Sequence, residues 1–469
     1  MIIKRNDLKE IILFSIISSL FSLGMQVSFS WRVGWTVLTL ISISLLVSYI
    51  NQLTNKKIIY DKFLFLLGIF VFIMFEPFIF LFQGLDFPFV DDRLISDNFI
   101  ANKTGLIVSL YALFFYVGRI IAFKFIRPKP IKSYQANSKI GLISISLFII
   151  MAISPFFISG TESLIDNFLI NIAGRSTGNI GFSSVSLGAS NFIIVLLGAS
   201  ILPTIILVGI YAMDKNIFLK ILFSSICIIL FILYASLGGR SGVILVFITL
   251  MILWHVKSKK RFPIFRFTIF SLLGLFILLY QINYRDDGFV DDEMNMSALT
   301  GYELNRELAF IVSHYGENED FISTQNIISS SIFPLIDTFI LFVTNPIPRA
   351  VWSNKPIDES FAPYNTLRTG LTGFEGTSNI TPTIPGRYYM KYGVIGVMQA
   401  GILIGILWFW ANIYILKYSS SGLLKLLIPV FAVSLLFICT RDFTAGRIYP
   451  LLFLILFVYL NKIRITKIN

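Results

Sequence analysis

Long apolar runs are the feature that most limits how this chain can fold. Twelve such runs recur along the 469 residues, and each is close to the roughly 20 residues that an α-helix needs to cross a bilayer. They are too long and too uniformly apolar for the alternating strands of a membrane barrel. Only 14% of the residues are charged, against about 25% in an average soluble domain. The sequence therefore predicts an all-α polytopic membrane protein.

The predicted helices number twelve, so both termini are expected on one side of the membrane. The first run lacks a small-residue cleavage site and is interpreted as a retained helix. The spans are expected at residues 8–29, 33–50, 61–83, 104–126, 139–159, 190–213, 216–236, 241–256, 264–283, 392–416, 423–440 and 446–462.

The charges divide unequally between the two sets of connecting segments. The set that contains the termini holds 23 of the 38 Lys and Arg and four acidic residues, whereas the other set holds 14 Lys and Arg and 21 of the 26 acidic residues. Because Lys and Arg accumulate in short cytoplasmic loops, the termini are predicted to be cytoplasmic. The net charge of +12 then reflects membrane orientation and requires no nucleic-acid partner.

One outer segment is as large as a small domain. We divide the chain into residues 1–283 with helices 1 to 9, residues 284–391 as an extracytoplasmic loop with short helices, and residues 392–469 with helices 10 to 12. No internal repeat is visible, although many secondary transporters are built from repeats.

Familiar motifs of soluble enzymes and metal sites are absent from the sequence. It contains no CxxC, HExxH, GxxxxGK[ST] or GxSxG pattern. Cys227 and Cys439 fall inside apolar runs and are interpreted as small buried hydrophobes. Asp91 and Asp92 form an acidic pair that could bind a divalent cation, but adjacent acids are common in loops. We expect no cofactor and no metal.

Arginines dominate the basic residues of the outer face, with eleven Arg and only three Lys. A planar guanidinium binds phosphate or carboxylate through two parallel hydrogen bonds, which suits an anion site at the membrane surface. Several of these arginines stand beside glycine near helix ends, where the backbone can approach a ligand, and a helix that opens near Ser241 would add its N-terminal amides. The arginines beside glycine or in the same segment are Arg175, Arg240, Arg387, Arg441 and Arg447.

Simpler roles also fit these side chains. Each outer arginine could instead extend to lipid phosphates or pair with a neighbouring acid such as Asp442. Arg119 lies inside the fourth predicted span, nearer the cytoplasm, and is expected to extend toward the lipid headgroups. Candidate general bases on the outer face are His314, Glu375 and Asp442.

A stretch of the large outer loop resembles a known family. The sequence "NPIPRAVWSNKP" at residues 345–356, followed by "TPTIPGRYYMKYGVIG" and another apolar helix, is similar to Wzy-type O-antigen polymerases, as is the earlier "GGRSG". The plan of about a dozen spans with a large late outer loop is also similar to that of the family. The chain departs from the family pattern at Arg387, where an acidic residue would be expected.

The resemblance implies a function that agrees with the arginines. Such polymerases transfer a growing glycan from one polyprenyl pyrophosphate carrier to the next lipid-linked unit, at the outer face of the bacterial cytoplasmic membrane. Guanidinium groups would stabilise the charge that develops on the leaving pyrophosphate. We expect Arg349 and Lys355 to join the glycine-flanked arginines in this role, with Trp352 and Tyr388 stacking on sugar rings. Through the family, a chain-length regulator and a flippase are expected partners.

Two other functions fit the same sequence. An O-antigen ligase would catalyse the same class of transfer onto a lipid A core acceptor. A flippase or other transporter of lipid-linked oligosaccharides would also have about a dozen spans, but the large outer loop and the missing repeats favour it less.

Overall fold

The structure is a computed structural model of the 469-residue chain. It describes residues 2–27, 30–55, 57, 59–84, 87, 98–125, 142–158, 200–209, 217–236, 240–258, 308–313, 383–419, 423–439 and 450–456. These residues form helices and no extended strand, which confirms the helical class.

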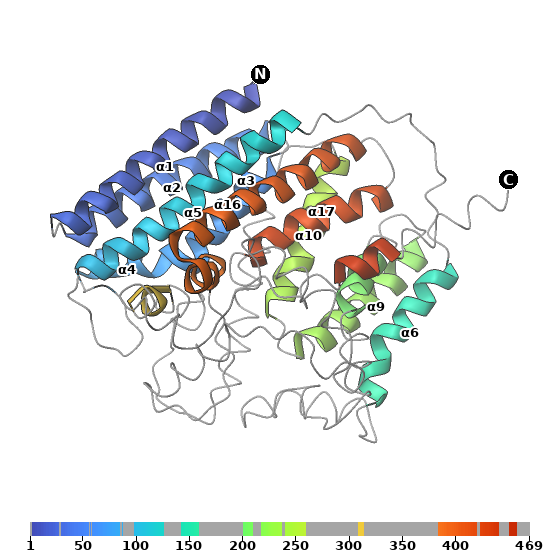
Figure 1. Ribbon diagram of the computed structural model, residues 1–469. Helices are drawn as coiled ribbons and strands as arrows, with labels where there is room; N and C mark the ends of the chain where they lie inside the picture. Colours follow the sequence, from blue (N-terminus) through green and yellow to red (C-terminus); the bar gives the residue numbers. More distant parts are fainter. Residues whose placement is uncertain are drawn as a thin grey trace, which may run out of the picture.

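Four long helices are close to the predicted spans. They are α1 (Ile2–Gln26), α2 (Trp31–Thr54), α5 (Asn98–Phe125) and α16 (Ile384–Tyr418). Figure 1 shows α1, α5 and α16 running side by side. By length and apolar composition, four helices of the described residues could cross a membrane, and a bent pair formed by α3 and α4 makes a possible fifth.

The bent pair begins with α3 (Tyr60–Ile69), continues through one π-helical turn at Phe70–Met74, and ends with α4 (Phe75–Gln83). The two arms meet at 52°. Pro77 explains part of this bend, because proline has no N–H to donate to the carbonyl four residues earlier. The single helix predicted over residues 61–83 is therefore broken near its middle.

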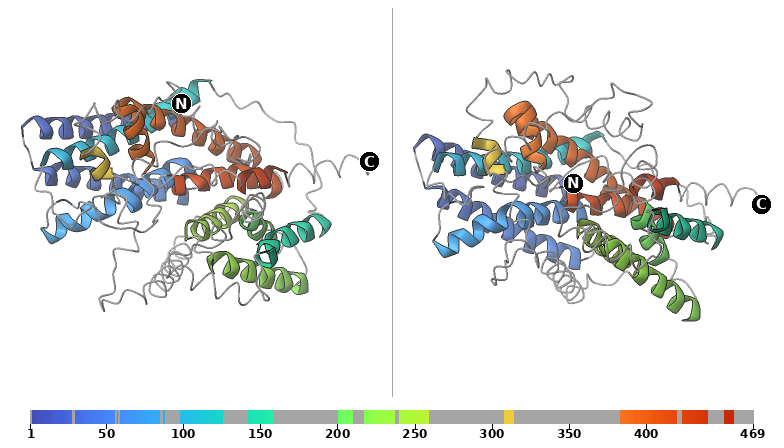
Figure 2. Two further views of the ribbon diagram at one scale, coloured as in Figure 1. Left: turned by 60° about the horizontal axis from the view of Figure 1, so that its bottom comes forward. Right: turned by 90° about the horizontal axis from the view of Figure 1, so that it is seen from below.

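The remaining described helices are shorter or less fully described. They are α6 (Leu142–Ile158), α9 (Ile217–Ser236), α10 (Arg240–Ser258), α17 (Leu423–Cys439) and the helical residues 200–209, 308–313 and 450–456. The views in Figure 2 show α6 and α9 on the side of the molecule away from α1 and α2. The predicted span at 264–283 lies outside the described residues, so the expected total of twelve stays a prediction.

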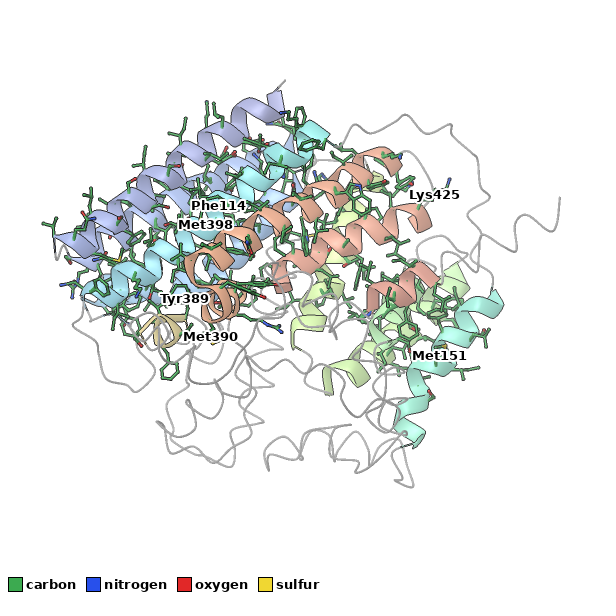
Figure 3. All side chains as sticks on the ribbon, in the orientation of Figure 1. Phe114, Met151, Tyr389, Met390, Met398 and Lys425 are labelled. Atoms are coloured by element: carbon green, nitrogen blue, oxygen red, sulfur yellow. The ribbon has the colours of Figure 1, made fainter. Side chains whose placement is uncertain are left out.

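Small residues allow α5 and α16 to pack closely. A Cβ atom at Gly405 would lie 2.1 Å from the carbonyl oxygen of Phe115, and one at Gly118 would lie 2.1 Å from the carbonyl oxygen of Ile402. Gly401 and Gly405 are four residues apart, the spacing that lets two membrane helices approach each other closely. Phe114 and Met398 mark this contact in Figure 3.

Polar contacts and aromatic rings join the first helices. The Ser18 hydroxyl donates to the Ser109 hydroxyl at 2.9 Å, and the Trp35 indole N–H donates to the Ala101 carbonyl at 3.0 Å. The Phe65 and Phe115 rings stack with centroids 3.6 Å apart. By contrast, a stripe of exposed apolar side chains runs along α1 at Leu8, Ile12, Ile16 and Leu23, which is the surface expected of a lipid-facing helix.

The contacts fix the relative directions of the helices. Residues Asp7 of α1, Asp61 of α3 and Arg119 of α5 meet at one end of the bundle, which we call the network end. Trp31 N–H donates to the Asn98 side chain at the other end, which we call the opposite end. Gly401 of α16 packs against Tyr111, and Gly405, one turn later, packs near Phe115 and Arg119 of α5. Because both sequences advance in the same direction, α16 runs parallel to α5 and begins at the opposite end.

Candidate functional site

The first turns of α16 carry two of the residues predicted to bind substrate. The Thr383 side chain accepts a hydrogen bond from the Gly386 amide at 3.2 Å, and Pro385 stands in the first turn, where its missing N–H costs nothing. This local start places Arg387 one turn into the helix, half-buried, and Tyr388 beside it, buried. The helix predicted from the apolar run starts eight residues later.

A short helical segment packs against this start. A Cβ atom at Gly386 would lie 2.9 Å from the side chain of Ile311 and 3.3 Å from that of Leu308, so glycine permits the close approach. Figure 3 shows Tyr389 and Met390 next to the helical residues 308–313. The candidate base His314 follows Ser313 in the sequence and lies outside the described residues.

A sharp turn separates these first turns from the membrane-length part of α16. Gly393 adopts φ 61° and ψ −152°, a conformation that favours glycine, and divides the helix at this point. Burial raises the pKa of Tyr389 to about 12, so its phenol stays protonated at neutral pH and can donate a hydrogen bond rather than accept a proton.

Arg240 opens α10 at the end of that helix that lies away from the network end. The other end of α10 carries His255, which contacts the Tyr60 hydroxyl at the start of α3, next to Asp61 of the network end. Fifteen residues of helix, roughly 22 Å at the usual rise, separate Arg240 from His255. Arg240 and Arg387 therefore both stand in first helical turns away from the network end, and helix N-termini favour anions.

The other predicted site residues lie outside the described residues. The structure neither brings them together nor separates them. They are Arg175, His314, Arg349, Trp352, Lys355, Glu375, Arg441, Asp442 and Arg447.

Sequence reasoning missed a buried charge network at the network end. Lys62 of α3 pairs with Glu10 of α1, with Nζ 2.8 Å from Oε2 and 3.0 Å from Oε1, and it also pairs with Asp7. Asp7, Glu10 and Lys62 are all at most 5% exposed in their side chains. Charges this deeply buried between helices are costly unless paired, and here each one is paired.

Arg119 joins the same network, which corrects the expectation that it extends toward lipid headgroups. Its guanidinium pairs with Asp61, lies 3.6 Å from Asp7 at Nε, and is 2% exposed. The Phe409 ring of α16 lies beneath it at 5.0 Å. The arginine is therefore directed into the helix bundle, because two carboxylates from neighbouring helices are available there.

Two tyrosines complete the network. The Tyr49 hydroxyl donates to Glu10 at 2.8 Å and lies 2.9 Å from the Tyr116 hydroxyl, and all three side chains are buried. Five elements thus meet around the charges, namely α1, α2, α3, α5 and α16. A sequence signal existed, since three of the four acidic residues assigned to the cytoplasmic side are Asp7, Glu10 and Asp61.

Comparison with protein-family models, with curated proteins and with solved structures finds no match for this chain.

Proposed function

We propose that this protein is a membrane glycosyltransferase that polymerises polyprenyl pyrophosphate-linked oligosaccharide repeat units at the outer face of the bacterial cytoplasmic membrane. The observation that supports the proposal is that Arg240 and Arg387 stand in the first turns of two separate helices, away from the network end. The opposite end would face outward, because the network end belongs to the lysine-rich side of the charge count.

The proposed chemistry requires an anion site and no resident metal. As the glycosidic bond to the carrier breaks, negative charge grows on the pyrophosphate, and fixed guanidinium groups in a site of low dielectric would stabilise it. Arg240, Arg387 and Arg349 are assigned to this role, with Lys355 beside them. The acceptor hydroxyl would lose its proton to His314, Glu375 or Asp442.

Aromatic residues support the sugar-binding part of the proposal. Tyr388 is buried at the start of α16, next to Arg387, so a sugar linked to a pyrophosphate held by Arg387 would be near its ring. Trp352 is assigned the same role in the large outer loop. An aromatic ring binds the apolar face of a sugar while its polar atom contacts a hydroxyl.

Complementation tests this function directly. The chain would be expressed in a bacterial strain that lacks its own O-antigen polymerase and supplies a matching repeat unit. Restoration of a glycan ladder on a gel supports a polymerase, and persistence of single-repeat products contradicts it. Expression in a strain that lacks its ligase is the matched comparison, because attachment of glycan to lipid A core there would identify the ligase alternative.

The buried charge network favours a second candidate, a transporter or flippase of lipid-linked oligosaccharides. Ionisable residues buried among membrane helices are frequent in proton-coupled transporters. A strain in which the gene is deleted separates the two functions. Lipid-linked units that accumulate on the inner face indicate a flippase, whereas units that accumulate on the outer face indicate the polymerase.

A further inference from the structure

Among the side chains that the structure describes, the network end contains an uneven number of buried charges. Three carboxyl groups, Asp7, Glu10 and Asp61, face two cations, Lys62 and Arg119, and each of these residues is less than 5% exposed. With every group ionised, the cluster would carry one uncompensated negative charge. Such a charge is strongly unfavourable in a medium of low dielectric, which favours neutralisation by a proton.

The geometry shows three carboxyls sharing two cations. Glu10 receives Lys62 on both of its oxygens and also accepts from the Tyr49 hydroxyl. Asp61 receives the terminal guanidinium nitrogen of Arg119. Asp7 contacts both cations through Oδ1, and each of these cations also serves another carboxyl.

Two carboxyl oxygens of the network are available for a proton. Asp7 Oδ2 and Asp61 Oδ1 are both buried, and neither has a hydrogen-bond partner among the described residues. A protonated carboxyl would keep the oxygen that faces a cation as an acceptor, while the other oxygen carries the hydrogen.

The groups that surround the carboxyls add no third cation among the described residues. From α2 and α5 come the neutral phenols of Tyr49 and Tyr116, and from α16 comes the Phe409 ring. His255 of α10 contacts the Tyr60 hydroxyl, and its ring packs edge-on against the Tyr60 ring. Lys9 is exposed on the other face of α1.

We propose that the network is a proton-binding site and that its three carboxyls share one exchangeable proton. Loss of this proton leaves an extra negative charge between α1, α3 and α5, so occupancy of the site controls how firmly the three helices pack. The inference concerns a site away from Arg240 and Arg387, and it holds whether or not the protein is a polymerase.

Infrared difference spectroscopy of the full-length protein in lipid nanodiscs tests the proposal, because a protonated carboxyl has a C=O stretching band that a carboxylate lacks. Subtracting the spectrum of Asp7→Asn from that of the wild type is expected to reveal this band, and the band is expected to shift in D₂O because the proton exchanges. Asp61→Asn is expected to remove the band as well, since either substitution balances the charges. Tyr49→Phe changes no charge and is the control that keeps it.

Two results would overturn the proposal. One is a protonated-carboxyl band of equal intensity in the wild type, Asp7→Asn and Asp61→Asn proteins. The other comes from Lys62→Met, which removes a cation and is expected to increase the band above the wild-type intensity. An unchanged band in that variant would mean that charge balance does not set the protonation of the network.

Discussion

Lys62 Nζ lies 2.8 Å from Glu10 Oε2 in the interior of the bundle, and this contact joins α3 to α1. The same ammonium group also pairs with Asp7. A single side chain from α3 therefore contacts two carboxyl groups three residues apart on α1, the spacing that places both on one face of the helix. The pairing allows α1 to carry acidic residues into a buried position.

Replacing Lys62 by methionine should destabilise the protein. The change leaves Glu10 and Asp7 buried without this cation, and breaking a buried pair from one side costs about 3–5 kcal/mol. The melting temperature of the purified protein in detergent measures the loss. Lys57→Met, at an exposed position just before α3, is the control and should change stability by less than about 0.5 kcal/mol.

A double variant distinguishes charge imbalance from lost packing. Lys62→Met combined with Glu10→Gln removes one charge of each sign, so it should be more stable than Lys62→Met alone. A double variant that melts at a lower temperature than Lys62→Met would show that the two side chains stabilise the protein through their packing rather than through their charges.

The contact between α5 and α16 should not tolerate a larger residue. Gly405→Ala places a methyl group 2.1 Å from the Phe115 carbonyl oxygen, a backbone atom that can move only with its helix. We expect a loss of about 1–3 kcal/mol, as for other overpacked cores. Gly209→Ala is the matched control, because its new methyl group would meet Leu250 at an ordinary 3.5 Å. Equal melting temperatures for the two variants would contradict the close packing.

Arg387 should contribute to glycan transfer through the two parallel hydrogen bonds that its planar guanidinium group can donate. Arg387→Ala should lower the polymerisation rate by roughly 100-fold, the usual effect of losing one donor to a developing anion. Arg387→Lys should recover part of this rate, because it keeps the charge but loses the bidentate geometry. Arg32→Ala is the control at the same end of the bundle, since Arg32 donates to the Gly84 carbonyl at 2.9 Å and has no assigned role. Rates measured with a lipid-linked substrate in membranes check the series.

Apolar runs predict where the helices lie, but they do not predict where the helices end. The first apolar run begins at residue 8, whereas α1 begins at Ile2 and includes Asp7 and Glu10. An acidic residue indicates the end of a membrane helix only when no cationic side chain is available to pair with it inside the bundle. Here the partners, Lys62 and Arg119, come from α3 and α5, and pairing between distant segments is not visible in the local sequence.

The site is predictable only in part, for a similar reason. The positions of Arg240 and Arg387 near helix starts follow from local glycine, proline and threonine signals, such as Thr383 and Pro385 before Arg387. The turn at Gly393 has φ 61°. A glycine at this position permits that conformation, but its presence in the sequence does not predict it. The prediction for Arg119 is wrong because an arginine inside an apolar run can either extend to the lipid headgroups or form a buried ion pair. The local sequence does not distinguish these two environments.

The most direct test of the polymerase proposal is the glycan made by Arg240→Ala and Arg349→Ala variants in a strain that depends on this gene. Both variants should reach the membrane at wild-type levels, as measured on a blot, and both should give single-repeat products in place of the ladder. A full-length ladder from both variants, at equal expression, would contradict the assignment of these arginines to the lipid pyrophosphate.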